Sequence, residues 1–300
     1  MAHLIKLEDY ESRYQFDLNR YPSQFSRMKR ERWYYLKNEW EQAQQELDVF
    51  EVEAEEQTNE SGWKELFQRL FSRKDKLRED EPAEDEKLRL KSMTLPELKQ
   101  MFLDELFISQ LRWASSSLLG ESSLDPRYKR DEWLRFFTLQ LPDNYFLMYK
   151  PVFHIKKAPI DLDIVLISPA ELILITLLEG HEYSIFEAST NRFWIEYVHQ
   201  EKRKRLSPLL SMTRMSGVIE TILKENQFSF PIRRIVLSPT SMIDNRLPNI
   251  NVEIVDKRTF RHWHESLKRQ PSPLKHEQMK VTAILLDYCS PQGNSDDETE

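Results

Sequence analysis

Glycine and cysteine are scarce in this 300-residue chain. Five glycines occur, whereas an average usage of about 7% would give about 21. Rossmann-type and Walker-type phosphate loops need several closely spaced glycines, and the sequence has no such cluster. Cys289 is the single cysteine, which excludes a disulfide framework and a cysteine-rich zinc site and fits a reducing compartment. These two absences set aside nucleotide-cofactor enzymes of those classes and small disulfide-stapled proteins.

Long apolar runs and an excess of positive charge are also missing. No apolar run approaches the roughly 18 to 20 residues of a membrane span, and acids stand near the N-terminus where a secretory signal is apolar. We therefore expect a cytoplasmic protein with no membrane partner. The net charge is −7, with 40% hydrophobic and 31% charged residues, which is typical of a globular chain. Binding to nucleic acid would have to use a local basic patch.

The first part of the chain has helical periodicity. Apolar residues three and four apart over residues 21–56 predict a long amphipathic helix or a short coiled coil, with the seam Trp33, Leu36, Trp40, Ala43, Leu47 and Phe50. Another helix is expected over 62–71, a charged linker near 72–92, and a helix opening at Thr94-Leu-Pro-Glu97, where threonine suits the N-cap. We expect an all-helical N-terminal region over residues 1–125.

After Tyr145 the pattern changes to short β-rich segments separated by turn residues. The predicted strands cover residues 146–155, 161–168, 171–178, 183–187, 192–198, 231–238 and 252–255, with helices over 129–139, 208–226 and 259–267. This order predicts an α/β (α+β) fold in which a mixed central sheet is flanked by helices. We place this domain at 126–270, followed by a C-terminal extension with an acidic tail at 271–300.

Several short motifs follow one another between Leu139 and Leu267. They are Leu-Pro-Asp-Asn-Tyr145, Asp163-Ile-Val-Leu-Ile-Ser-Pro, Ile-Leu-Ile-Thr176, Trp194, Leu206-Ser-Pro-Leu209 and the strand at 231–238. In this order and spacing they resemble the nuclease-related domain (NERD), a member of the restriction-endonuclease-like PD-(D/E)xK group. The resemblance covers nearly half of the chain and implies a restriction-endonuclease-like fold.

The resemblance also implies metal-assisted hydrolysis of a phosphodiester, in which carboxylates hold Mg²⁺ and a lysine offsets developing charge. Asp163 matches the family's strand aspartate, and Glu132 matches its helical glutamate. The family's Glu-x-Lys falls on Thr176-Leu177-Leu178, and neither Thr176 nor Leu178 has the required group. The catalytic site is therefore predicted to be dismantled, with no cofactor expected.

Two ways of retaining the site stay open. Asp161 and Asp163 are candidate metal ligands, and Mg²⁺ is the expected cofactor if activity is retained. Lys156 and Lys157 lie near the mouth of the predicted sheet and are candidates for a relocated cation. Glu179 is expected to point away from the strand face that carries Thr176 and Leu178, because side chains alternate along a strand.

Two basic segments are candidates for contact with nucleic acid. The run Lys202, Arg203, Lys204 and Arg205 is expected in a loop, where it either touches a phosphate backbone or is solvated. Basic residues also alternate with aromatic ones between Tyr21 and Tyr35. They form either a stacking surface for bases or the two sides of an amphipathic helix, and the regular apolar seam favours the helix.

The leading functional hypothesis is a catalytically inactive nuclease-related protein that binds nucleic acid or a protein partner. The first alternative is an active Mg²⁺-dependent DNA nuclease with relocated site residues. The second alternative is a structural or oligomerising protein that associates with a partner or with itself through residues 21–56.

Overall fold

The computed structural model describes residues 1–56, 89–116, 123–155, 158–199, 201–246, 251–269 and 272–290, and the side chains of these residues outside 46–56. The chain divides into two compact units, residues 1–24 with 107–300, and residues 25–106. The expected helix at 62–71, Lys156, Lys157 and the acidic tail lie outside the described residues. No helix in the described part of the chain is long and apolar enough to cross a membrane.

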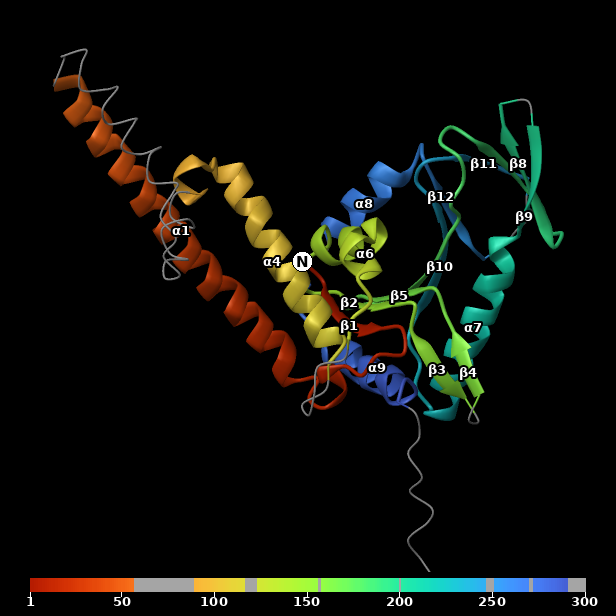
Figure 1. Cartoon of the computed structure of the whole chain (residues 1–300). Helices are drawn as coiled ribbons and strands as arrows, with labels where there is room; N and C mark the ends of the chain where they lie inside the picture. The colour runs from red at the N-terminus through yellow and green to blue at the C-terminus, as the bar shows by residue number, and fades with distance from the viewer. Residues whose placement is uncertain are drawn as a thin grey trace, which may run out of the picture. The chain divides into compact units, whose positions relative to one another are not determined.

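The larger unit is built on a six-stranded mixed sheet (Figure 1). Its strands, in spatial order, are β1 (His3–Leu7), β2 (Phe146–Tyr149), β5 (Ile164–Ile167), β6 (Leu172–Leu177), β10 (Ile232–Ser238) and β12 (Glu253–Asp256). Neighbours β2, β5 and β6 are antiparallel, whereas β1 is parallel to β2, and β6, β10 and β12 are parallel to one another. A mixed sheet was predicted, and the structure has one.

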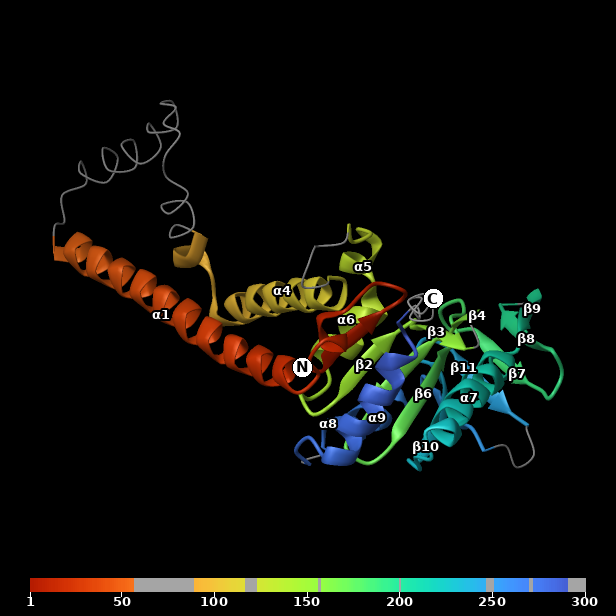
Figure 2. The ribbon, with the colours of Figure 1, turned by 90° about the horizontal axis from the view of Figure 1, so that it is seen from below.

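Two apolar layers cover this sheet. On one face the helices are α5 (Arg127–Arg130), α6 (Glu132–Leu139), α8 (Phe260–Lys268) and the end of α4 from Phe107. On the other face, which Figure 2 shows from the helix side, they are the short η1 (Arg13–Gln15), α7 (Pro208–Glu225) and α9 (His276–Asp287). Because both faces are buried, the central strands read as nearly continuous apolar runs instead of alternating ones.

A second, four-stranded sheet belongs to the same unit and has the order β11-β7-β8-β9. Its strands are β11 (Met242–Asn245), β7 (Ile185–Ala188), β8 (Phe193–Val198) and β9 (Glu201–Leu206). A separate hairpin pairs β3 (Val152–Ile155) with β4 (Ala158–Asp161). Since β6 leads into β7 and β10 leads into β11, the four-stranded sheet continues from the edge at which the parallel strands β6 and β10 both end.

The turn between β5 and β6 was predicted, and the structure confirms it. The hydroxyl oxygen of Ser168 accepts hydrogen bonds from the N–H groups of Ala170 (3.2 Å) and Glu171 (2.9 Å), and the hydroxyl donates to the Glu171 carbonyl. Pro169 suits the second position of such a turn because its φ is already fixed. The turn sets β5 and β6 in the register Ile164↔Ile175.

The prediction of an all-helical N-terminal region is wrong for the first residues, which form β1 at the edge of the main sheet. All five residues of β1 are buried, including Lys6, so the sequence does not show the alternation of apolar and polar residues that marks a half-buried strand. The Lys6 ammonium donates to the carbonyl oxygens of Tyr10 (2.6 Å) and Cys289 (3.2 Å), and burial lowers the pKa of Lys6. A lysine at this position gives no hint of a buried strand in the sequence.

The unit boundaries also differ from the predicted ones. Residues 1–24 belong with the sheet, and α9, which lies in the expected C-terminal extension, packs with α7 in one apolar cluster. The buried residues of α9 include Val281, Leu285 and Leu286. The apolar stripe of α9 therefore completes the core beneath the main sheet.

The smaller unit contains most of α1 (Arg20–Glu56) and the first part of α4 (Leu95–Ala114). The predicted seam faces partners within the unit: Trp33 lies 5.1 Å from Phe102 between ring centroids, and the Trp40 indole N–H donates to the Met93 carbonyl at 2.8 Å. Leu36 and Ala43 are buried. As far as Ala43, therefore, the seam contacts residues of this chain, and association through residues 21–56 stays a prediction.

Candidate functional site

A cavity of about 490 Å³ opens in the larger unit, on the side of the main sheet covered by α6. It lies where α6 begins, where β2 and β6 end and where β5 begins. Its lining contains four carboxylates and one ammonium group, together with apolar side chains: Asp131, Glu132, Trp133, Tyr149, Lys150, Asp163, Ile164, Leu177 and Glu179. An excess of carboxylates in one cavity favours a cation as part of whatever binds there.

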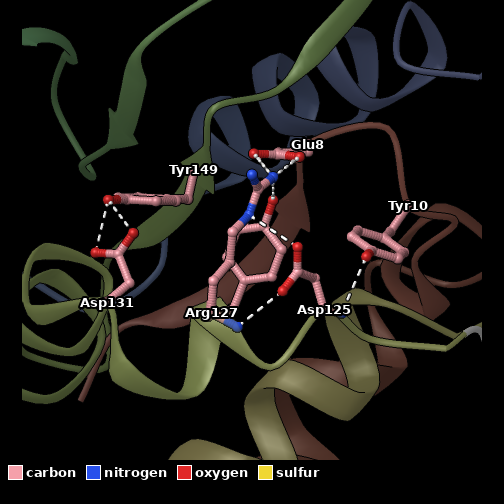
Figure 3. A network of polar contacts seen from close by, with 7 residues as sticks. Glu8, Tyr10, Asp125, Arg127, Asp131 and Tyr149 are labelled. Atoms are coloured by element: carbon pink, nitrogen blue, oxygen red, sulfur yellow. Dashed lines mark hydrogen bonds and ion pairs between the residues drawn. The ribbon is translucent and has the colours of Figure 1, made fainter.

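Asp131 fixes the helical wall of the cavity. Its carboxylate caps α6 by accepting the Leu134 N–H at 2.9 Å, and both of its oxygens lie 2.9 Å from the Tyr149 hydroxyl that donates to them (Figure 3). Burial and the neighbouring Asp131 charge raise the pKa of Tyr149, so the phenol stays protonated. This pair ties α6 to β2 and leaves Glu132, the next residue, at the cavity.

A second network holds the segment before α6 against β1. The Arg127 guanidinium bonds to the Glu8 carboxylate at 2.9 Å, lies 3.3 Å from that of Asp125, and contacts the Tyr128 hydroxyl (Figure 3). The Tyr10 hydroxyl accepts the Asp125 N–H at 3.2 Å. None of these acids lines the cavity, so this network positions the site and does not belong to it.

Lys150 and Asp163 face each other across the ends of β2 and β5. The pairing Tyr149↔Ile164 is the last of that ladder, and the Lys150 N–H then donates to the Asp163 carbonyl at 2.7 Å. Lys150 has a left-handed backbone with φ of 49°, a conformation that costs energy for a residue with a Cβ. The turn thus brings one cation and one carboxylate to the same cavity.

The Asp163 carboxylate is held from the other side of the sheet. Its Oδ2 atom accepts a hydrogen bond from the Ser211 hydroxyl of α7 at 2.7 Å. Asp161, the other predicted metal ligand, is exposed in β4 and does not line the cavity. Of the two candidate aspartates, the structure brings only Asp163 to the site.

The two faces of β6 correct the prediction about the Glu-x-Lys position. Ile173 and Ile175 pack toward α6, and Leu177 packs against the same cluster and lines the cavity. Thr176 is buried on the opposite face, and Leu178 packs with Phe186 and Trp194. Neither Thr176 nor Leu178 lines the cavity, although the β5–β6 register sets Thr176 opposite Asp163 on the face of the sheet that α7 covers.

Glu179 does line the cavity, although it was expected to point away from the site. Alternation along the strand puts Glu179 on the side of Leu177, which also lines the cavity. Gly180 follows directly, and a Cβ on it would be 2.5 Å from Cε2 of Phe186. This close approach needs glycine and fixes the path of the chain next to Glu179.

Mg²⁺ is the metal that the resemblance implies, and the donor set at the cavity suits it. Carboxylate oxygens are hard ligands, and Mg²⁺ keeps several waters while using one or two protein carboxylates. In the described part of the chain, no three or more His, Cys, Asp or Glu residues are grouped so as to hold a metal by themselves. The cavity therefore fits a partly hydrated Mg²⁺ and does not fit a fully protein-bound transition metal.

The basic run at Lys202, Arg203, Lys204 and Arg205 lies in strand β9, so the predicted loop is wrong. Arg205 binds the buried Glu196 carboxylate at 2.7 Å, and Arg203 binds Glu201 at 2.9 Å. Strand propensity could not predict β9, because its sequence is mostly lysine and arginine, which have low strand propensity. The segment forms a strand because it pairs with β8.

Sequence reasoning missed Lys150 and Asp131 and set Glu179 aside. Lys150 follows an apolar strand, as Lys156 and Lys157 nearly do, and nothing in the sequence distinguishes it. Asp131 occupies a helix N-cap, which is a recognisable role, but its contact with Tyr149 is a tertiary one. Of the candidate residues that the resemblance implies, Glu132 and Asp163 both line the cavity.

Comparison with known proteins gives one curated relative of note. An RNA 2',3'-cyclic phosphodiesterase from Geobacillus stearothermophilus is 35% identical over 112 residues, which are 36% of this chain. The match spans about a third of the relative's own length (35%). No family model matches the sequence, and no solved structure matches it. The resemblance to nuclease-related domains accordingly remains a prediction.

Proposed function

We propose that this chain is a nuclease-related protein that binds a nucleic-acid phosphodiester with Mg²⁺ in the acidic cavity and cleaves it. The observation that carries this proposal is the gathering of Glu132, Asp163, Glu179 and Lys150 around one cavity. This favours the active nuclease with relocated residues over the inactive protein that the Thr176 and Leu178 positions suggested.

The order of elements supports the restriction-endonuclease-like assignment. A helix with Glu132 precedes β2, Asp163 stands at the start of β5, and Glu179 follows β6. The resemblance implies a glutamate on a helix, an aspartate at one strand and an acidic position on the next strand. Here the last acid stands after the strand, and Lys150 supplies the cation from the end of β2.

The charges explain how the site would work. Without a cation, the carboxylates repel a phosphate; Mg²⁺ bound by Asp163 with Glu132 or Glu179 would polarise the phosphodiester and activate water. Ser211 holds one Asp163 oxygen and so orients the carboxylate. The Lys150 ammonium then lies where it can offset the charge that develops on the phosphoryl oxygens. Trp133 offers an apolar wall for the sugar or base.

The curated relative supports the choice of bond. Its name states that it acts on RNA 2',3'-cyclic phosphates, which are phosphodiesters. Because the match is partial, we propose for this chain only the class of bond, a phosphodiester, and not the relative's substrate.

The proposal is tested by an Mg²⁺-dependent cleavage assay on plasmid DNA, single-stranded DNA and RNA. Asp163→Asn and Glu179→Gln are expected to reduce the rate about 100-fold or more, because each removes a charge that acts on the metal or the transition state. Asp161→Asn and Thr176→Val are the matched controls, since neither residue lines the cavity, and both should keep the wild-type rate. Loss of cleavage in Asp161→Asn with retention in Asp163→Asn would refute the assignment.

Binding without cleavage is the second candidate function. Two observations favour it: the described residues offer no group of three metal-ligating side chains, and one Asp163 oxygen is already occupied by Ser211. Mg²⁺-dependent retention of uncleaved nucleic acid, lost in Asp163→Asn, would identify this function in place of the first.

A further inference from the structure

One face of the four-stranded sheet carries aromatic, aliphatic and basic side chains together. The strand register places on this face Ile185 and Glu187 of β7, Phe193, Ile195 and Tyr197 of β8, Lys202, Lys204 and Leu206 of β9, and Met242 and Asp244 of β11. Residues directly opposite each other in a ladder share a face. The assignment therefore follows from pairing alone.

The opposite face of this sheet is closed. It carries Phe186, Trp194 and Ile243, which pack with Leu178 and Val236 of the main sheet. The buried Glu196 carboxylate lies on this side, and Arg205 binds it there. Arg203 and Arg205 thus belong to the closed side of β9, whereas Lys202 and Lys204 belong to the open side.

The open face exposes apolar groups that a folded protein usually covers. Ile185, Phe193 and Leu206 are 40%, 45% and 57% exposed. A contiguous apolar patch of this kind typically marks an interaction site. Since β9 lies at the edge of the sheet and all of its residues are exposed, the patch is open on that side.

The charge on this face is unevenly distributed. Toward β11, the Glu187 and Asp244 carboxylates both lie near Arg246, at 3.5 and 2.8 Å. Toward β9, the Lys202 ammonium lies 5.3 Å from the Tyr197 ring centroid, and the Arg192 guanidinium lies 5.8 Å from that of Phe193. Lys202 and Arg192 flank the two rings, and Arg246 neutralises the nearby acids. The β8–β9 half of the face is therefore positive.

We propose that this open face binds single-stranded nucleic acid, with bases stacked on Phe193 and Tyr197 and phosphates contacting Lys202 and Lys204. Exposed aromatic side chains on a four-stranded sheet bind unpaired bases in this way, and flanking cations follow the backbone. An acidic peptide would satisfy the lysines but would not need the rings. The ligand class rests on the proposed function, which makes nucleic acid the substrate.

The position of this face relative to the cavity fits that ligand. Glu179 follows β6, and the chain passes through Gly180 directly into β7. The parallel strand β10 ends at the same edge and leads to β11. The four-stranded sheet therefore adjoins the end of the main sheet at which Glu179 lies.

The experiment measures binding of a fluorescein-labelled oligothymidylate to the full chain by fluorescence anisotropy in EDTA. Chelation removes the divalent cation that the acidic cavity needs, so binding at the sheet face is measured alone. Lys202→Gln/Lys204→Gln should weaken binding at least tenfold and lower the slope of log affinity against log salt by about 1.4, since two phosphate contacts are lost.

Phe193→Ala should weaken binding about tenfold through loss of stacking, and Phe193→Tyr should restore it. Arg203→Gln is the matched control, because it removes a cation from the closed side of the same strand, and it should bind like wild type. Circular dichroism and thermal melting check that each variant remains folded.

Equal losses in Arg203→Gln and in the double lysine variant would overturn the proposal, since the effect would then depend only on overall charge. Equal affinity for duplex and single-stranded DNA would overturn it as well, as would an acidic peptide bound in place of the oligonucleotide. Cleavage with Mg²⁺ is measured separately: if it fails while EDTA-insensitive binding persists, the catalytic proposal is wrong and this one stands.

Discussion

The acidic cavity and the open face of the four-stranded sheet lie in one unit and have opposite electrostatic character. Carboxylates dominate the cavity, with Lys150 as its single lining cation, whereas Lys202 and Lys204 lie on the sheet face that carries the exposed Phe193 and the half-buried Tyr197. A polyanion meets repulsion at the first region unless a cation is bound, and attraction at the second. Divalent metal should therefore separate the two: cleavage requires it and strand binding does not.

This comparison also shows why the net charge of −7 says little about partners. Four carboxylates and one ammonium group line the cavity, whereas Lys202 and Lys204 stand on the open face, and a total over the whole chain does not show this difference. What matters is which side chains share a cavity or a sheet face, and tertiary structure decides that.

The largest predicted effect that separates the two regions is at Lys150. Lys150→Met should lower the Mg²⁺-dependent cleavage rate about 100-fold, because the one cation that faces the phosphoryl oxygens is lost. Oligothymidylate binding in EDTA should be unchanged, since that binding uses the sheet face. Steady-state cleavage kinetics measure the first result, and fluorescence anisotropy on the same preparation measures the second. A cleavage rate close to wild type would remove Lys150 from the site.

The next prediction separates two arginines of β9 by stability. Arg205→Gln leaves the buried Glu196 carboxylate with its bond from the His181 N–H at 2.8 Å but without its ionic partner. It should lower the free energy of unfolding by about 1–3 kcal/mol. Arg203→Gln removes an exposed pair and should cost less than about 0.5 kcal/mol.

Urea unfolding curves measure both changes in the free energy of unfolding. Similar losses for the two variants would mean that the ion pair between Arg205 and the buried Glu196 adds no more stability than the exposed pair between Arg203 and Glu201.

Most elements of the general architecture could be predicted from the sequence. Strands β5, β6, β8 and β10, helices α1, α7 and α8, and the Ser168 turn were predicted because their apolar spacing and turn residues agree with the structure. β1 and β9 were missed for a common reason: their charged residues hide strand propensity, and distant pairing overrides it.

The site was only partly predictable. Glu132 and Asp163 follow from the resemblance, whereas Lys150 and Glu179 enter the cavity because of a left-handed turn and a choice between two buried faces of β6. When both faces of a strand are buried, alternation tells which residues share a face but not which face has the site. That choice depends on where α6 packs, and the sequence of β6 does not contain it.

The smallest predicted effect concerns acid stability and refines the comparison of the two arginines of β9. Burial opposes ionisation of Glu196, but hydrogen bonds from His181 and Arg205 outweigh it and lower the Glu196 pKa. A depressed carboxyl pKa contributes stability that is present above the ordinary value near about 4.3 and is lost as pH falls through the folded value. The stability advantage of wild type over Arg205→Gln should therefore be complete at neutral pH and shrink on acidification.

Urea midpoints measured from neutral to acidic pH check this, with Arg203→Gln as the control that tracks wild type throughout. A gap between wild type and Arg205→Gln that stays constant into acid would mean that Arg205 acts by packing its side chain, and not by stabilising the Glu196 charge.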